Sequence, residues 1–318
     1  MLKWKKIGKI FDPSEHVLSN ECFGFAQSPQ ALVFNDFVRI YFSTRKKDLN
    51  GKFLSFISFV DMDKTFSRVL NVSSDTVIEL GKLGSFDEHG IFPINPLRRN
   101  DKILAYTCGW SRRVSVSVET STGLAISEDE GKTFKKMGDG PIMSSSLDEP
   151  FLVGDAFVKV YGDTFHMWYI YGTRWINHPD DDTPARVYKI GHAVSADGVT
   201  WKREGKAIIP DKLNAEECQA LPTVIDFNNR YHMFFCYRQA TGFRKNKDRG
   251  YRIGYAYSEN LVDWIRDDEA AGIDVTPGNW DSDMMCYPHV FNMDGKIYLL
   301  YNGNEFGRHG FGVALLER

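Results

Sequence analysis

The sequence lacks the long apolar runs that would carry it through a membrane. None of its apolar stretches approaches the roughly 20 residues of a membrane-spanning helix. The basic start, residues 1–6, is not followed by the apolar segment of a secretory signal. We therefore expect a cytoplasmic protein that has no membrane partner.

Cysteine is scarce, and neither sign of charge is in large excess. The chain has 5 cysteines, an odd number without a Cys-x-x-Cys pair, which predicts reduced and mostly buried thiols rather than disulfides or a zinc site. The formal net charge of −3 offers no basic surface for nucleic acid. We therefore expect no nucleic-acid partner, and the oligomeric state stays open.

Several common site motifs and the helical period are also absent. The sequence has no glycine-rich phosphate loop, no His-Glu-x-x-His and no Gly-x-Ser-x-Gly, so we expect no cofactor and no dedicated metal motif. No segment keeps an apolar period of about 3.6 residues, which argues against long helices. What the sequence has is 14% aromatic residues and runs of alternating apolar and polar residues, which are typical of strands.

One unit of sequence recurs five times. It has an apolar strand, often with a proline, a turn into an aromatic strand, a Gly-x-Ala-x-Ser strand, and then Trp or Phe. The glycine that opens the third strand recurs at residues 123, 191, 254 and 312, so the intervals are 68, 63 and 58 residues. Each interval has room for four antiparallel strands and their loops. Internal repeats of this length indicate a radial or stacked architecture.

The last copy stops after Gly312-Val313-Ala314, before its Trp strand, and the start of the chain, Trp4–Ile10, resembles the missing strand. The sequence therefore predicts an all-β fold, a five-bladed β-propeller in which the N-terminal strand completes the last blade, as a single domain over residues 1–318. Closure of this kind would protect two sheet edges from solvent. A β-sandwich is the alternative, and the recurring Gly-x-Ala pattern makes it less consistent with the sequence.

Polar residues recur where the first strands of a propeller would line the central channel. Asp155 stands inside the apolar run 151–158, where a carboxylate needs a partner or a function. A buried aspartate that only accepts backbone hydrogen bonds is the alternative. Other acids, Asp87, Glu88, Glu217 and Asp283 among them, precede the first strands of their copies, and we expect them to converge on the same pocket.

Arginine and asparagine recur at the ends of the second strands, at Arg45, Arg112, Arg238 and Asn302. Arginine binds carboxylate and phosphate groups through two parallel hydrogen bonds, so these residues suggest a pocket for a sugar that carries such a group. His89 and His289 lie near the same mouth and are candidate acid–base or ligand residues.

Particular segments resemble those of the five-bladed propeller glycosidases of glycoside hydrolase families 43, 32, 62 and 117. The segments 25–30, 86–93, 219–222 and 280–283 also resemble those of glycosidase-like proteins found near bacterial surface-polysaccharide genes. The resemblance implies a carbohydrate substrate, and it adds Gln27 and Gln219 to the substrate-binding candidates, which are then Gln27, Arg45, His89, Arg112, Gln219, Arg238, His289 and Asn302.

The family's catalytic residues carry over only in part. Asp155 matches the aspartate that tunes the pKa of the proton donor, but Ser28 occupies the place of the catalytic base, and Gln219 and Ala220 stand where a glutamic acid would be. The hypothesis is therefore a glycosidase or related sugar-transferring enzyme that uses Asp155, with Asp87 or Asp283 as base or nucleophile and Glu217 or Glu88 as proton donor. The alternative is a non-catalytic propeller that binds a glycan or nucleotide sugar.

Overall fold

The computed structural model describes residues 1–179 and 183–317, and this part of the chain is built almost entirely from antiparallel strands. One sheet contains β10 (Phe151–Tyr161), β11 (Thr164–Ile176), β12 (Ala185–Ser195) and β13 (Lys202–Arg203). A second contains β14 (Glu217–Phe227), β15 (Arg230–Gln239), β16 (Arg252–Ser258) and β17 (Ile265–Arg266). A third contains β18 (Cys286–Met293), β19 (Lys296–Asn302), β20 (Phe311–Leu316) and β1 (Trp4–Phe11).

The largest sheet joins two antiparallel groups through one parallel bridge between Ser55 and Gly90. The first group is β2 (Gln27–Val33), β3 (Phe37–Lys47), β4 (Phe53–Asp63) and β5 (Val69–Val72). The second group is β6 (Gly90–Arg99), β7 (Lys102–Arg112), β8 (Val118–Ser127) and β9 (Lys135–Lys136).

The helices of the described residues are all short 3₁₀ turns, and none has the length and apolarity to cross a membrane. They are η1 (Pro13–Glu15), η2 (Ser19–Glu21), η3 (Lys247–Arg249), η4 (Asp268–Ala271) and η5 (Asn304–Gly307). The prediction of an all-β protein is therefore confirmed.

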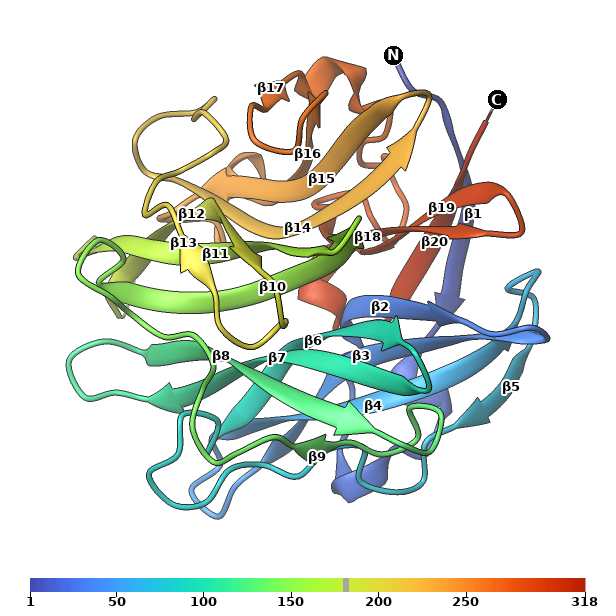
Figure 1. The fold of residues 1–318 in the computed structure, drawn as a ribbon, viewed down its shortest axis with the longest axis horizontal. Coiled ribbons are helices and arrows are strands. Elements are labelled where there is room, and N and C mark those ends of the chain that lie inside the picture. Colours follow the sequence, from blue (N-terminus) through green and yellow to red (C-terminus); the bar gives the residue numbers. More distant parts are fainter. Residues whose placement is uncertain (180–182, 318) are drawn as a thin grey trace.

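The first strand of each repeat lies toward the middle of the molecule. Figure 1 shows β2, β6, β10, β14 and β18 near the centre, with β5, β9 and β17 toward the outside. Neighbouring inner strands contact one another in turn, from β2 to β6, β10, β14, β18 and back to β2. The ends of these five strands are thereby brought around one common axis.

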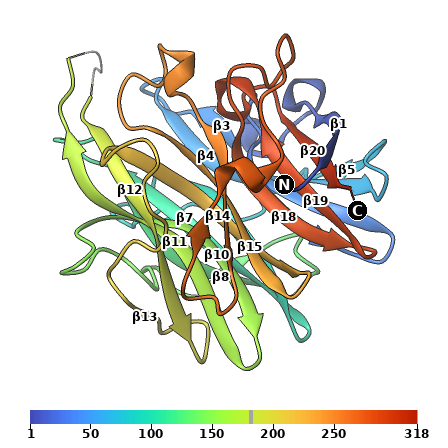
Figure 2. The ribbon, with the colours of Figure 1, turned by 90° about the horizontal axis from the view of Figure 1, so that it is seen from above.

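The first strand of the chain pairs with the last, as the sequence predicted. β1 runs antiparallel to β20, with Trp4 opposite Leu316 and Phe11 opposite Phe311, and Figures 1 and 2 both show the two termini close together. The Trp4 indole donates to the Ala271 carbonyl at 2.9 Å and its ring meets Phe234 edge-on at 5.5 Å. β1 therefore protects the edge of β20 and also links its sheet to the preceding one.

We expect Trp4→Ala to lower the free energy of unfolding by about 2–3 kcal/mol, because it removes a half-buried ring and its hydrogen bond. Ile7→Ala, at an exposed position of the same strand, is the control and should cost less than about 0.5 kcal/mol. Urea denaturation followed by far-ultraviolet circular dichroism measures both. Equal losses in the two variants would contradict a closing role for Trp4.

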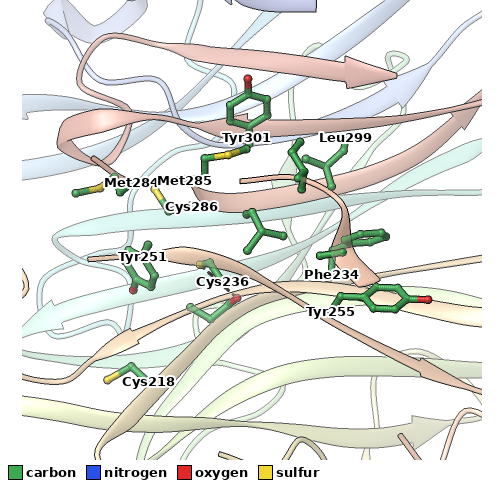
Figure 3. Close-up of a cluster of buried hydrophobic side chains, with 14 of the residues drawn as sticks. Cys218, Phe234, Cys236, Tyr251, Tyr255, Met284, Met285, Cys286, Leu299 and Tyr301 are labelled. Carbon is green, nitrogen blue, oxygen red and sulfur yellow. Dashed lines mark hydrogen bonds between the residues drawn. The ribbon is translucent and has the colours of Figure 1, made fainter. Parts of the chain in front are cut away.

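Apolar side chains from neighbouring sheets meet in layers. Figure 3 shows the layer between the β14–β17 sheet and the β18–β20 sheet, where Phe234 and Tyr301 are fully buried. Cys218, Cys236 and Cys286 lie in the same layer. All five cysteines are free and four are buried, which confirms the prediction of reduced thiols that mainly pack.

Each inner strand contains a bulge just before the position at which four of the five copies have a proline, Pro29, Pro93, Pro222 and Pro288. The pairing register shifts there in β2, β6, β10, β14 and β18. Ser28, Asp155, Leu221 and Tyr287 have φ of 54°, 51°, 48° and 57°, a region that residues with a side chain rarely adopt. A bulge re-aims a side chain relative to the regular pleat. The repeated bulge is thus the local feature that turns Asp155 toward the centre.

Candidate functional site

A cavity of about 410 Å³ lies where the inner strands converge. Its polar lining comes from several sheets, and its apolar lining is largely aromatic. Polar residues of the lining include Gln27, Arg45, Asp155, Arg186, Tyr188, Arg238, Arg244 and Tyr251. Aromatic residues of the lining include Phe25, Phe92, Trp110, Phe243, Tyr287 and Phe306. Of the predicted site residues, the structure brings Asp155, Gln27, Arg45 and Arg238 together here.

Asp155 is the only carboxyl group that lines this cavity among the described residues. It is 7% exposed and accepts hydrogen bonds from the Leu221 backbone N–H and the Cys108 thiol. A Cβ on Gly154 would lie 2.3 Å from the Cys108 sulfur, so glycine is required for this close approach. Burial raises the pKa of Asp155 to about 7, although the positive charge of Arg186 opposes the rise. The carboxyl group is therefore substantially protonated at neutral pH.

Arg45, on β3, is held in the cavity by a neutral partner. Its Nε and Nη2 donate to Gln27 Oε1 at 2.9 and 2.8 Å, and Gln27 Nε2 donates to the Phe306 carbonyl at 2.6 Å. Burial lowers the pKa of Arg45, and repulsion from Arg186 and Arg244 lowers it further. Because an amide rather than a carboxylate fixes this guanidinium, its charge is not cancelled.

Arg238, at the end of β15, is 3% exposed and also has only neutral partners among the described residues. It donates to the carbonyls of Gln239 and Ala240 and, at 2.9 Å, to the Tyr188 hydroxyl. Its guanidinium carbon lies 3.6 Å from the centre of the Phe243 ring. Within the described residues its Nε has no hydrogen-bond partner.

The sequence did not single out Arg186, Arg244, Tyr188 or Tyr251. Arg186 is the second residue of β12 and Tyr188 the fourth, whereas the basic residues that recur in the repeat stand at the ends of second strands. Arg244 and Tyr251 lie in or beside the connection from β15 to β16, which has no counterpart of similar sequence in the other copies. Arg186 and Tyr188 alternate with Ala185 and Val187 in β12, and this alternation was the one signal that pointed to two of them.

Two of the predicted catalytic acids lie outside the cavity, in ion pairs within their own sheets. Asp87, before β6, pairs with Lys136 of β9, and Glu217, at the start of β14, pairs with Arg266 of β17. Both acids are at most 1% exposed. The expectation that these acids converge on one pocket is corrected, because each is directed to a basic residue of the outermost strand.

The same ion pair recurs in two further copies. Glu149 before β10 pairs with Arg203 of β13 at 2.7 Å, and Asp281 before β18 pairs with Lys6 of β1 at 2.5 Å. In all four copies a buried carboxylate just before the inner strand, or at its first residue, pairs with a basic residue on the fourth strand. We call this recurring contact the acid–base clasp.

The other two predicted acids also lie away from the cavity. Glu88 Oε2 accepts from the Gly84 backbone N–H at 2.8 Å, and Asp283 accepts from Lys247 Nζ at 2.8 Å and from Ser282 Oγ at 3.0 Å. Neither lines the central cavity. Their contacts are those of loop carboxylates, so the structure does not bring them to Asp155.

Two predicted substrate-binding amides are internal braces instead. Asn302 is fully buried; it accepts from the Ser28 backbone N–H at 2.8 Å and donates to the carbonyls of Ala26 and Gly310. Gln219 is fully buried and donates to Glu217 Oε1 at 3.0 Å. Asn302 therefore holds the bulge of β2, and Gln219 supports the clasp of its own sheet.

The remaining predicted residues, Arg112, His89 and His289, do not line the central cavity. Arg112 donates to Asp48 Oδ2 at 2.7 Å and lines a separate hollow of about 510 Å³, and its backbone N–H faces His89 Nδ1. His289 is 4% exposed among the rings of Phe157 and Phe291. Burial lowers the pKa of His289 to about 3, so this imidazole is neutral.

The described residues contain no group of three or more His, Cys, Asp or Glu side chains placed to hold a metal ion. The chemistry that the cavity itself offers is one carboxyl group with a raised pKa, several guanidinium groups and aromatic walls. This combination suits a polar ligand with a ring-shaped apolar face and a negative charge.

No protein-family model matches the chain. The chain is 32% identical over 317 residues to the uncharacterized proteins MT1551 and Rv1502 of Mycobacterium tuberculosis, covering 99% of this chain and 100% of each relative. It is 29% identical over 117 residues to the 1,2-beta-oligomannan phosphorylase of Thermoanaerobacter sp., which is 36% of this chain and 35% of that enzyme.

Solved structures of glycoside hydrolases have a similar fold. The structure of BT0996 in its RGII complex matches with a TM-score of 0.74 and 19% identity, covering 100% of this protein and 93% of BT0996 as solved. A thermostable family-43 glycoside hydrolase matches with a TM-score of 0.61 and 16% identity, covering 95% of this protein and 91% of that hydrolase. At these identities the similarity concerns the fold, which is the all-β, propeller-type fold of glycosidases.

Proposed function

The chain belongs to the family of the Mycobacterium tuberculosis proteins MT1551 and Rv1502, and on this premise we propose that it is a carbohydrate-active enzyme that cleaves a glycosidic bond in its central cavity. The glycosidase-type fold and the partial similarity to an oligosaccharide phosphorylase support this class of reaction. Fold alone does not determine activity, so the proposal depends on the cavity.

The single observation that carries the proposal is Asp155. A carboxyl group with a pKa of about 7 is matched to donating a proton to a leaving oxygen near neutral pH. The sequence suggested that Asp155 tunes another acid. Since no other carboxyl group among the described residues lines the cavity, we assign the proton-donating role to Asp155 itself.

We further propose that the sheets form five blades within one domain, residues 1–318, with the largest sheet counted as two blades. Its two antiparallel groups share only one bridge, and the inner strands contact one another in a ring of five. We also retain, as proposals, a cytoplasmic location and a substrate from bacterial surface polysaccharide metabolism.

A substrate screen tests the function. Purified protein would be incubated with aryl glycosides and with oligosaccharides, including β-1,2-linked mannosides, each with and without inorganic phosphate, and products would be identified by mass spectrometry. Cleavage that is retained through purification supports the enzyme. If ligands raise the melting temperature but no product forms, the protein is instead a non-catalytic propeller that binds a glycan or a nucleotide sugar. Ser28 and Ala220, which stand where the propeller glycosidases have catalytic acids, favour this alternative.

We expect kcat to fall as pH rises above about 7, approaching a tenfold loss per pH unit. Proton donation needs the protonated form of Asp155, and that form is depleted above its pKa of about 7. Initial rates at saturating substrate between pH 5.5 and 9 measure this profile. A rate that stays level or rises to pH 9 would contradict Asp155 as the donor.

A further inference from the structure

Within the part of the chain that the structure describes, the carboxyl groups that line the central cavity do not balance its positive charge. Four arginines line the cavity, against one carboxyl group. Among residues 1–179 and 183–317, none of the four forms an ion pair with a carboxylate. Because the pKa of Asp155 is raised to about 7, its carboxyl group is only partly ionised at neutral pH and offsets at most one of the four positive charges. Guanidinium groups stay charged at any physiological pH, so the cavity carries an excess of several positive charges.

Two of these arginines are held in place at a cost in free energy. Burying a charge is unfavourable unless an opposite charge and hydrogen bonds compensate it. Arg238 is almost completely buried with neutral acceptors only, and its Nε has no partner among the described residues. Arg45 is fixed by the amide oxygen of Gln27, where a glutamate would have cancelled its charge. A buried guanidinium with neutral supports is typical of a site that receives its counter-charge from a ligand.

The arginines also stand where a ligand can reach them. Arg186, Arg238 and Arg244 line both the central cavity and an adjoining hollow of about 340 Å³. Arg238 and Arg244 both lie over the ring of Phe243, with their guanidinium carbons 3.6 and 4.4 Å from its centre. The ring fixes two positive groups near each other at the junction of the two spaces.

We propose that this junction is a binding site for an oxyanion of the phosphate class, formed by Arg45, Arg186, Arg238 and Arg244. Several guanidinium forks match a group with three terminal oxygens and two negative charges better than they match a single carboxylate. The aromatic part of the wall, Phe92 and Tyr287 among it, remains for the face of a sugar. The inference rests on the proposed function only in one respect, which is that it places the anion beside the glycosidic bond whose leaving oxygen receives the proton of Asp155.

The anion has two sources, free phosphate or a phosphoryl group on the sugar. A glycosidase that inverts the configuration of the anomeric carbon needs a second carboxylate to activate water. The cavity lining has no second carboxylate among the described residues. Free phosphate needs no such base. Its oxygen forms a bond to the anomeric carbon, the bond to the leaving oxygen breaks, and that oxygen takes the proton of Asp155. The proton of monohydrogen phosphate restores Asp155, so the products are a sugar 1-phosphate and an alcohol.

Calorimetric titration of the full chain with inorganic phosphate, at constant ionic strength and pH 7.5, tests the site. We expect saturable binding that weakens at least about 10-fold in Arg244→Gln and Arg45→Gln, because each loses a charged hydrogen-bonding group. Arg113→Gln is the matched control, since Arg113 lies in the neighbouring hollow and pairs with Glu119. Arg244 is exposed, so its substitution should leave the melting temperature unchanged.

Hexose 1-phosphates, hexose 6-phosphates and the neutral hexoses complete the titrations. Binding of inorganic phosphate, together with phosphate-dependent cleavage that releases a sugar 1-phosphate, identifies free phosphate as the source. Binding of phosphorylated sugars alone identifies a substrate phosphoryl group. The proposal is overturned if neither class binds, or if Arg113→Gln weakens binding as much as Arg244→Gln.

The two proposals fail in different ways. Anion binding without cleavage of any glycoside would contradict the proposed enzymatic function and support the anion site. Cleavage of neutral glycosides at a rate that does not depend on phosphate, with no binding of either anion class, would contradict the anion site and support the enzymatic function.

Discussion

Replacing Asp155 with asparagine is expected to lower turnover about 10²- to 10⁴-fold, the usual worth of a positioned general acid, while the protein stays folded. Asparagine keeps an oxygen that can accept from the Leu221 N–H and the Cys108 thiol, and it tolerates the φ of 51° at this position. Only the transferable proton is lost. The rate of product formation and the melting temperature, measured on one preparation, check both parts.

Asp294→Asn is the matched control, because Asp294 also has a positive φ, 52°, but lies in the exposed turn between β18 and β19. Its turnover should equal that of the wild type. Titration with inorganic phosphate adds a second readout, since Asp155→Asn should still bind the anion through the arginines. Full turnover in Asp155→Asn would exclude Asp155 as the donor, and loss of folding would favour the interpretation of a buried structural aspartate.

The same substitution predicts a pH-dependent change in stability. The pKa of Asp155 is raised from 3.8 to about 7 on folding, so between these values the native protein holds a proton that the unfolded chain has released. The free energy of unfolding of the wild type should therefore fall relative to Asp155→Asn as pH rises from about 4 to about 7, and level off above. Urea denaturation at several pH values measures the difference, and a difference that does not change with pH would contradict the raised pKa.

The all-β fold and the pairing of β1 with β20 could be predicted from the sequence, because the repeated residues are those that form strands and turns. The pairing of β1 with β20 follows from an unfinished last copy and an isolated first strand. Ser28, Asp155, Leu221 and Tyr287 stand at the same position of the repeat in their copies. What they share is a bulge with an unusual backbone angle, and that property is not visible in residue types, since Ser, Asp, Leu and Tyr all occur there.

The site was predicted less well, because the sequence shows where a charged residue stands in the chain but not which residue it pairs with. The acids before the inner strands were interpreted as pocket residues, yet four of them form the acid–base clasp. The basic partners Lys6, Lys136, Arg203 and Arg266 each stand two positions after the aromatic residue that marks the fourth strand. Pairing these two columns across the repeat would have separated structural acids from Asp155, which has no basic partner of this kind.

Replacing Glu217 with alanine is expected to cost about 3 kcal/mol in the free energy of unfolding, because it removes one of the two buried carboxylates that pair with Arg266, the other being Asp268. Glu217 is fully buried and its Oε1 lies 2.5 Å from Nη1 of Arg266, whose side chain is only 6% exposed. Its Oε2 accepts from the backbone N–H groups of Lys212 and Leu213 at 2.9 Å, and these would also lose their acceptor. The two-residue strand β17 would lose this ion pair with β14. Urea denaturation measures the loss.

Glu305→Ala provides the comparison, since Glu305 pairs with Arg308 on the surface at 3.0 Å, and an exposed pair of this kind is worth less than about 1 kcal/mol. If the clasp explains Glu217, turnover per folded molecule in Glu217→Ala should stay near the wild-type value at a temperature where the variant is still folded. If Glu217→Ala were as stable as the wild type but had no turnover, Glu217 would be a catalytic residue after all. The contrast with Asp155→Asn, which should lose turnover and keep its stability, separates the acid that serves the reaction from the acid that serves the fold.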